Sequence, residues 1–147
     1  MRYLNKLSSA SILMVILFLI SGLLAQDGEK GHYFTITTWK VSVPEDGSRA
    51  EFNQMMQDWT DKITRKNDKV ISEKIMTHAS GHDSRDLVII TEYASWNDIE
   101  SAQEKQNELL KAAWPEEKDR KELFKNFGRY FVMHSDEIYE ELPNLRK

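Results

Sequence analysis

The chain has 147 residues, 30% of them charged, with a net charge of −4 and no cysteine. The lack of cysteine excludes disulfides, thiolate catalysis and cysteine-ligated metal sites. The excess of acidic residues argues against nucleic acid or an anionic membrane surface as a partner.

The first 25 residues have the pattern of a secretory signal peptide. Two basic residues precede an apolar run over 10–24, and the small residue Ala25 stands before polar residues. The run is shorter than the roughly 20 residues that a membrane span prefers. We therefore expect cleavage after Ala25, with a secreted or periplasmic product and no stable membrane insertion afterwards. Retention of the segment as an uncleaved anchor is the alternative.

The sequence predicts one folded domain behind this segment. Cleavage would remove two basic residues and no acidic ones, so the net charge would become −6. A short flexible leader (26–31) would precede the domain (32–140), and a polar tail (141–147) would follow it. The domain has enough residues for one core and too few for two.

The domain is predicted to contain four strands and three helices. Aromatic and β-branched residues predict strands over 32–43, 70–79, 87–94 and 130–138. Apolar residues at helical spacing predict helices that begin after Ser48 and Ser95, each with an acidic residue three positions on. Pro115 predicts a break before a third helix, which Gly128 would end. The order β-α-β-β-α(α)-β is that of the ferredoxin-like fold, an α+β class with helices on one face of an antiparallel sheet.

Alternation along the strands predicts which residues the helices cover. One parity is apolar and is expected beneath the helices: Phe34, Ile36, Ile71, Ile75, Leu87, Ile89, Phe131 and Met133. The other parity carries aromatic, apolar and a few polar side chains. This second set is too apolar for a freely solvated face, so a second subunit, a ligand or both are expected to cover it.

The strand order and the motifs resemble those of the dimeric α/β-barrel superfamily, which includes antibiotic-biosynthesis-monooxygenase-like domains. The resemblance covers residues 32–140 and rests on the aromatic first strand HYFTITTWKV and on the segment EYASW at 92–96. The break at Pro115 and the closing segment 134–139 are similar to those of a subgroup of exported, uncharacterised bacterial proteins. The resemblance implies a homodimer whose two sheets face each other and enclose small cavities. Members use such cavities for cofactor-free oxygenation, haem handling, isomerisation or ligand binding.

The candidate site lies on the second parity of the strands. We expect a small apolar or aromatic ligand to contact Tyr33, Thr37, Trp39, Met76, His78, Ile90, Glu92 and His134. Among these, His78, Glu92 and His134 are the candidates for general acid–base work. The same three side chains could bind a divalent metal, or they could be hydrogen-bonded residues at a dimer interface.

The sequence favours ligand binding or a structural role over catalysis. It has no Gly-rich phosphate loop, no Gly-x-Ser-x-Gly motif and no zinc-protease helix. We expect an exported homodimer that binds a small ligand or is structural, without cofactor or metal. The alternative is a cofactor-independent monooxygenase or isomerase that acts on a small molecule.

Overall fold

A computed structural model of the protein describes residues 30–147. Gly31–Leu142 form one compact unit, and the short 3₁₀ helix η2 (Pro143–Leu145) belongs to a separate one. The predicted signal peptide and most of the predicted leader lie outside the described residues. No helix within residues 30–147 is long and apolar enough to cross a membrane.

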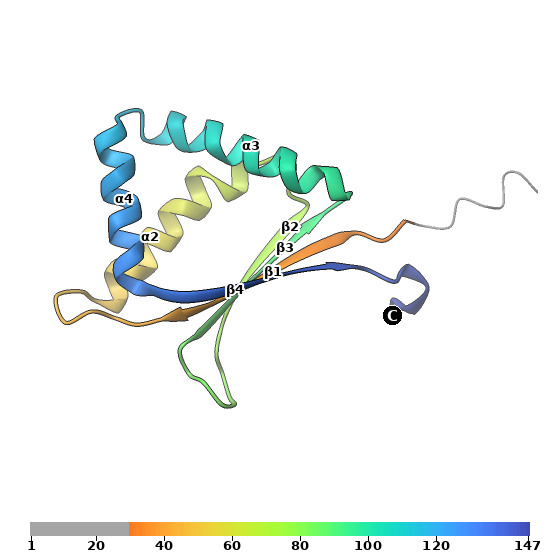
Figure 1. Ribbon diagram of the computed structural model, residues 1–147, viewed down its shortest axis with the longest axis horizontal. Coiled ribbons are helices and arrows are strands. Elements are labelled where there is room, and N and C mark those ends of the chain that lie inside the picture. The colour runs from red at the N-terminus through yellow and green to blue at the C-terminus, as the bar shows by residue number, and fades with distance from the viewer. Residues whose placement is uncertain (1–29) are drawn as a thin grey trace, which may run out of the picture. The chain divides into compact units, whose positions relative to one another are not determined.

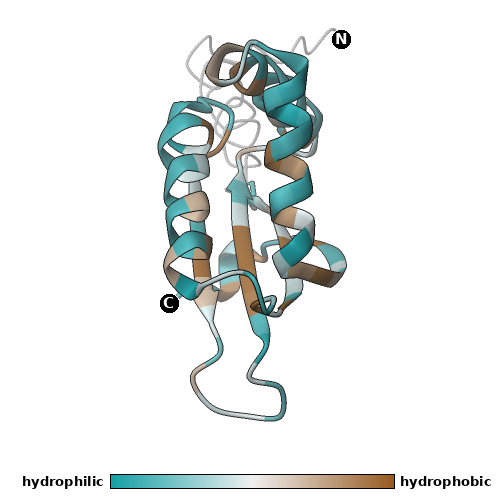
Figure 2. Cartoon of the chain, turned by 90° about the vertical axis from the view of Figure 1, so that its left-hand side faces the viewer, coloured by the Kyte–Doolittle hydropathy of each residue, from teal (hydrophilic) through white to brown (hydrophobic). Residues whose placement is uncertain are grey.

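The compact unit is an antiparallel sheet with its α-helices on one side (Figure 1). The strands lie in the order β2-β3-β1-β4, as in a ferredoxin-like fold. Hydrophobic stretches follow the strands, whereas most of each helix is hydrophilic (Figure 2). In chain order the elements are β1 (Tyr33–Val41), α2 (Arg49–Lys62), the 3₁₀ helix η1 (Thr64–Lys66), β2 (Ser72–Thr77), β3 (Asp86–Tyr93), α3 (Trp96–Ala113), α4 (Glu117–Tyr130) and β4 (Phe131–Glu140).

The predicted helix starts are confirmed. The Ser48 hydroxyl accepts a hydrogen bond from the Glu51 backbone N–H at 3.1 Å, and α2 begins at Arg49, directly after Ser48. The Ser95 hydroxyl accepts one from the Asp98 backbone N–H at 3.3 Å, at the start of α3. Each serine satisfies a backbone donor that the first helical turn leaves without a partner. The predicted break at Pro115 separates α3 from α4.

The prediction that Gly128 ends the last helix is wrong. Helix α4 continues to Tyr130, whose side chain is fully buried. The Tyr130 hydroxyl donates to the Glu51 carboxylate at 2.7 Å and accepts from the Ser48 backbone N–H at 3.1 Å. The ring also packs against Phe52 in the core. These contacts hold the last turn of α4 against the start of α2, and they outweigh the low helix propensity of glycine.

The predicted orientation of β1 is also wrong. Trp39 pairs with Leu87 in the register of β1 and β3, and both pack in the core cluster that includes Phe52. The odd-numbered residues of β1 therefore face the helices, and Phe34 and Ile36 lie on the opposite face. Both parities of β1 carry large apolar side chains, so hydrophobicity alone could not set the register. The predictions for Ile75, Leu87 and Ile89, which face the helices from β2 and β3, are confirmed.

A register shift in β4 explains a further difference. Val41 pairs with Phe131, whereas the preceding Lys40 pairs with Met133, so one extra residue is inserted in β4. Phe131 packs against the core as predicted, but Met133 is 60% exposed. Beyond the shift, the even-numbered residues of β4 face the helices, beginning with His134.

Candidate functional site

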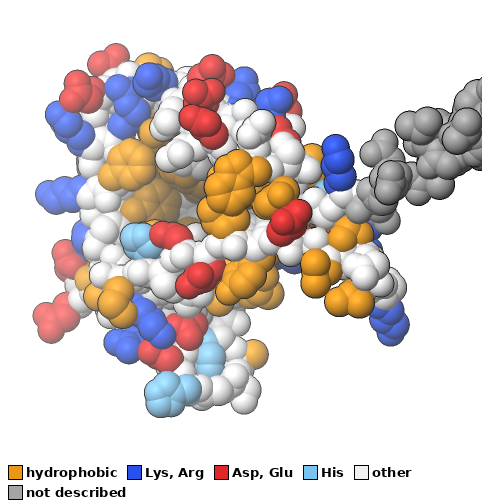
Figure 3. Space-filling view, turned by 45° about the vertical axis from the view of Figure 1, so that its right-hand side comes forward, with side chains coloured by type: hydrophobic (Ala, Val, Ile, Leu, Met, Phe, Trp, Pro, Cys, Tyr) orange, Lys and Arg blue, Asp and Glu red, His pale blue; other side chains and the backbone are white. Residues whose placement is uncertain are grey.

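A cavity of about 750 Å³ lies between the helix-covered face of the sheet and the helices. Its volume falls in the range of pockets that hold small organic ligands. Figure 3 shows hydrophobic side chains gathered in this hollow, with many charged side chains on the surface above it. The apolar part of the wall is formed by Trp39, Met56, Trp59, Val70, Ile63, Ile75, Ile89, Ile99, Ala102, Phe124, Phe127 and Phe131.

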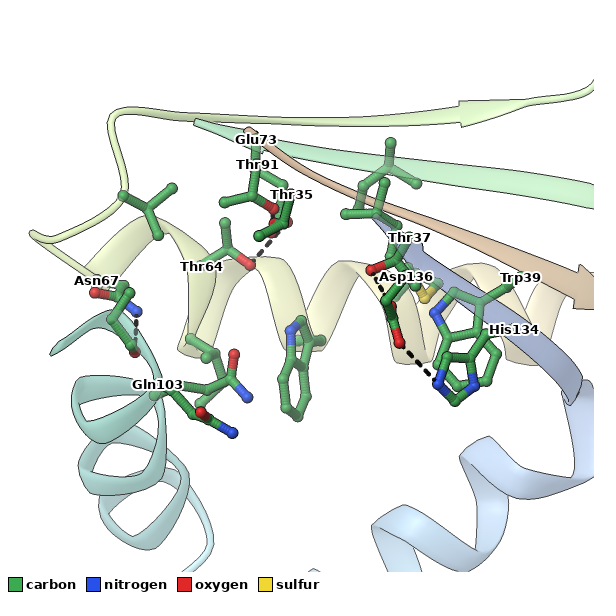
Figure 4. Close-up of a pocket in the computed structure, with 18 of the residues that line it drawn as sticks. Thr35, Thr37, Trp39, Thr64, Asn67, Glu73, Thr91, Gln103, His134 and Asp136 are labelled. Atoms are coloured by element: carbon green, nitrogen blue, oxygen red, sulfur yellow. Dashed lines mark hydrogen bonds and ion pairs between the residues drawn. The ribbon is translucent and has the colours of Figure 1, made fainter. Parts of the chain in front are cut away.

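One polar group of the cavity, the His134 group, consists of His134, Asp136 and Thr37. His134 Nε2 lies 3.0 Å from one Asp136 carboxylate oxygen, and the Thr37 hydroxyl donates to the other oxygen at 2.8 Å. The imidazole also lies against Trp39, with ring centroids 4.2 Å apart (Figure 4). Asp136 can fix the tautomer with a proton on Nε2, which leaves the lone pair on Nδ1. A base oriented by a carboxylate in this way is suited to proton transfer.

The second polar group, the Glu73 group, consists of Glu73, Thr64 and Thr91. The Thr64 hydroxyl donates to one carboxylate oxygen of Glu73 at 3.0 Å, and the Thr91 hydroxyl donates to the other at 3.3 Å. Burial raises the pKa of Glu73, and the two hydroxyl hydrogen bonds oppose that shift. Both threonines and Glu73 line the cavity, and Figure 4 shows them apart from the His134 group.

A buried asparagine joins η1 to α3 beside the Glu73 group. The Asn67 side-chain amide donates to the Ala102 carbonyl oxygen at 2.9 Å, and both residues line the cavity. The Asn67 side-chain oxygen accepts from the Lys69 backbone N–H at 3.2 Å. These bonds give the buried polar atoms of the Asn67 side chain their hydrogen-bond partners, and they hold the segment between α2 and β2 against α3. They fix the wall of the cavity near Thr64.

The opposite face of the sheet, here called the open face, contains Glu92. Glu92 pairs with Phe34 and Ser72, and it accepts hydrogen bonds from the Ser72 hydroxyl at 2.5 Å and from His32 Nδ1 at 2.6 Å. The bonds to Ser72 and His32 lower the pKa of the Glu92 carboxyl. Alternation places Phe34, Ile36, Thr38, Lys74, Met76, Val88 and Ile90 on the same open face.

The structure divides the predicted site residues between the two faces. Thr37, Trp39 and His134 share the cavity as predicted, but it lies on the helix-covered side of the sheet. Tyr33 is on the same side but outside the cavity wall, with its ring 5.9 Å from that of Trp96. The other predicted ligand contacts lie on the open face or beyond the strand: Met76, Ile90 and Glu92 on the open face, and His78 in the loop after β2.

The predicted trio of His78, Glu92 and His134 does not share a cavity. His134 faces the helices, whereas Glu92 lies on the open face and His78 follows the end of β2. The prediction assigned the even-numbered residues of β1 to the helix-covered face. It also lacked the extra residue in β4, and so placed His134 on the same face as Glu92. Within residues 30–147, no three His, Asp or Glu side chains are grouped so as to hold a metal ion.

Sequence reasoning missed the Glu73 group and the contributions of the helices to the cavity. A usable signal was present in β2. Glu73 stands between Ile71 and Ile75, on the parity that was expected beneath the helices. A carboxylate on a buried parity requires partners, and such residues are frequently functional. The alternation of β2 was therefore the signal in the sequence that could have identified Glu73.

Comparisons with known proteins identify the fold. No family model matches the sequence, and no curated protein matches it. A candidate antibiotic biosynthesis monooxygenase from Caulobacter crescentus CB15 is similar in structure, with a TM-score of 0.51, 15% identity, and coverage of 77% of this chain and 92% of that one. A nipsnap family protein of unknown function from Agrobacterium tumefaciens C58 gives a TM-score of 0.53, 11% identity, and coverage of 78% and 91%.

A third similar structure is described as a dimeric ferredoxin-like protein of unknown function from Thermobifida fusca YX. It gives a TM-score of 0.50 and 7% identity, with coverage of 79% of this chain and 96% of that one. At these identities the similarity concerns the fold alone. The predicted ferredoxin-like fold of this chain is thereby confirmed.

Proposed function

We propose that the protein is a homodimer in which each subunit binds a small apolar or aromatic molecule in its own cavity. The observation that carries this proposal is the combination of an aromatic and aliphatic wall with two separate polar groups in about 750 Å³. Binding pockets for small molecules have this composition, because apolar walls provide affinity and a few polar groups fix orientation. The three-dimensional arrangement favours the cavity over the open face as the ligand site.

Gly128 marks a point on the cavity wall where a side chain can be added without a clash. Gly128 lies within α4 and lines the cavity, and a Cβ atom added there would meet no atom within 4 Å. Glycine inside a helix costs roughly 0.5–1 kcal/mol relative to alanine. A packing contact does not explain this glycine, which is exposed where it borders the cavity.

The composition of the open face supports the homodimer. Ile36 and Ile90 are cross-strand partners in its centre, and Met76 beside them is 43% exposed. Apolar residues in the middle of a sheet face are the usual signature of a surface that another chain covers. A second copy of the same sheet would bury them by a symmetric contact.

A titration with 2-naphthol, a neutral aromatic probe, tests the proposal. Trp39 and Trp59 line the cavity, so binding should change the tryptophan fluorescence in a saturable manner. Gly128→Leu would place a side chain into the open space and should abolish this change. Gly128→Ala is the matched control, because it removes the glycine but adds only a methyl group, and it should keep most of the binding. Saturable binding that Gly128→Leu leaves unchanged would refute the cavity as the site.

A second candidate function is proton abstraction within the cavity, the first step of a cofactor-independent oxygenation or isomerisation. It is favoured by the His134 group, in which Asp136 orients the imidazole and Thr37 orients Asp136. In that step the C–H or O–H bond of the ligand breaks, its electron pair stays on the ligand, and His134 accepts the proton.

Deuterium exchange into a bound carbon acid, followed by NMR, tests this second function. With 2-tetralone in D₂O, the wild type should accelerate exchange at C1 over a matched buffer blank. His134→Gln should bring the rate to the blank while keeping the binding affinity within about threefold, because the side chain is 46% exposed and contributes little apolar surface. Equal rates for the wild type and the blank would eliminate the catalytic role and leave ligand binding.

We also propose that the protein is exported by residues 1–25. The support is the basic start, the apolar run and the small residue before the polar segment. Amino-terminal sequencing of protein from the native envelope or medium should begin at Gln26. A mature protein that begins at Met1 would show that the segment is retained.

A further inference from the structure

The charges of the cavity are of one sign. Glu73 and Asp136 line it, and no Lys or Arg side chain is among its lining residues in the described chain. Asp136 has an imidazole neighbour in His134. Among residues 30–147, the hydrogen-bond partners of the Glu73 carboxylate are the hydroxyls of Thr64 and Thr91. Thus the described lining of the cavity has acceptors for a positive charge and no Lys or Arg to pair with a negative one.

Glu73 differs from Asp136 in its burial. Its carboxylate is withdrawn from water, and no charged group is among the causes of its pKa shift. Two hydroxyl donors solvate a carboxylate less well than water does, so the ionised form is costly until a cation reaches it. Each carboxylate oxygen has one hydroxyl donor and retains capacity to accept a further hydrogen bond. The geometry therefore leaves room for one more donor on Glu73.

The surrounding wall also suits a cation with an apolar body. Tyr93 lies two residues along β3 from Thr91 on the same face, and Trp59 stands on α2 across the cavity wall. Aromatic faces attract organic cations, and the attraction strengthens where water is excluded. An anionic ligand would instead face two carboxylates, with no Lys or Arg among the described lining residues to compensate them.

We propose that the ligand of the cavity is a protonated organic amine with an aromatic or alkyl body. Its ammonium group donates to Glu73, and its body lies along the aromatic wall towards His134 and Trp39. This inference rests on the proposed ligand-binding function and specifies the chemical class of the ligand. Glu73 is then the residue that selects for charge, and the apolar wall accepts bodies of different shapes.

Three probes of nearly equal shape separate charge from size. They are 2-(2-naphthyl)ethylamine, the corresponding neutral alcohol 2-(2-naphthyl)ethanol, and the anion 2-naphthylacetate. Calorimetry at pH 8 should show the amine binding about tenfold more tightly than the alcohol, and the anion more weakly than both. At pH values near the raised pKa of Glu73, amine binding should also release protons, because the ammonium ion favours the ionised form of Glu73. The proton release is measured by comparing buffers of different ionisation enthalpy.

A matched pair of variants assigns the effect to the cavity. Glu73→Gln keeps the shape and should reduce amine affinity to that of the alcohol without changing alcohol binding. Glu104→Gln removes the same charge from the exposed surface of α3 and should leave the tenfold preference intact. If Glu73→Gln does not fold, as judged by circular dichroism, the wild type provides the test. Its amine affinity should then fall on acidification through the raised pKa of Glu73, while alcohol affinity stays constant.

The outcomes separate this inference from the proposed function. Equal affinities of the wild type for amine and alcohol would overturn the cation specificity and leave the binding cavity standing. An amine preference that survives in Glu73→Gln, or that does not change on acidification, would overturn the role of Glu73. No binding of any of the three probes would overturn both proposals.

Discussion

The imidazole of His134 lies against the indole of Trp39 at the paired position of the neighbouring strand, with ring centroids 4.2 Å apart. Both side chains point to the helix-covered face, and both line the cavity. Trp39 also contacts Phe131 at a centroid distance of 4.6 Å, so one indole joins the core to the polar His134 group. This shared ring positions a titratable group in a cavity that is otherwise mostly apolar.

Gly128→Ala should stabilise the protein. The glycine has a helical backbone within α4, and the new methyl group would meet no atom within 4 Å. The free energy of unfolding in urea should rise by about 0.5–1 kcal/mol, because alanine loses less backbone entropy on folding. A decrease would show that the space beside Gly128 is needed for the fold itself.

Tyr130→Phe should destabilise the protein. It removes the hydroxyl that donates to Glu51 and accepts from the Ser48 backbone N–H, and it leaves both groups without that partner. The midpoint of thermal unfolding should fall by about 5 °C. Tyr139→Phe, at an exposed site on β4, is the control and should change the midpoint little. Equal effects of the two substitutions would contradict the role of the Tyr130 hydroxyl.

Glu73→Gln should stabilise the unliganded protein at neutral pH. Burial raises the pKa of Glu73 in the folded state, so the folded chain binds that proton more tightly than the unfolded chain. Stability is therefore lost as pH rises from the unfolded value of about 4.3 through the folded pKa. Denaturation at several pH values should show a gain for Glu73→Gln at pH 7 that disappears at pH 3. A gain that is independent of pH would contradict this origin.

Glu92→Gln should have the opposite pH dependence. Hydrogen bonds from Ser72 and His32 lower the pKa of Glu92, so the ionised carboxylate stabilises the folded state. That stabilisation is present above the unfolded pKa and is lost as pH falls through the lower folded pKa. Glu92→Gln should therefore be less stable than the wild type at pH 7, and the difference should shrink on acidification. The same denaturation series measures it, and a difference that grows at low pH would be inconsistent with the assignment.

Ile90→Lys should disrupt the proposed dimer without unfolding the chain. Ile90 lies in the centre of the open face, opposite Ile36 and beside Lys74. A lysine in a sheet-to-sheet interface would lose its hydration there, beside the like charge of Lys74. Sedimentation should show a dimer for the wild type and a monomer for Ile90→Lys. Asn107→Lys adds the same charge to an exposed site on α3 and should remain dimeric. If the wild type sediments as a monomer at a concentration of about 10 micromolar, at which stable dimers remain associated, the homodimer is refuted.

The sequence was sufficient to predict the element order and most helix boundaries. Ser48 and Ser95 were identified as caps because their local chemistry does not depend on distant residues. The helix end at Gly128 was predicted wrongly because Tyr130 extends the helix through buried contacts with Ser48 and Glu51, which lie far earlier in the sequence.

The faces of the sheet were predictable only where one parity was clearly more polar. The strand containing Ile75, whose other parity carries Ser72 and Lys74, was oriented correctly, whereas β1 has large apolar residues on both faces. The extra residue near Met133 has no local signature, and it reverses the orientation of everything after it in β4. The prediction that His134 and Thr37 lie close together was correct, because β1 and the end of β4 were both assigned to the wrong face. It placed the two residues on the open face with Glu92, whereas they face the helices.

Binding of a neutral aromatic probe in paired variants tests the central claim most directly. Titration of 2-naphthol should give the same affinity for the wild type and for Ile90→Lys, because the cavity lies within one chain, and no binding for Gly128→Leu. The site is then the space between the sheet and the helices. Binding that Ile90→Lys abolishes and Gly128→Leu retains would place the ligand on the open face and contradict the account.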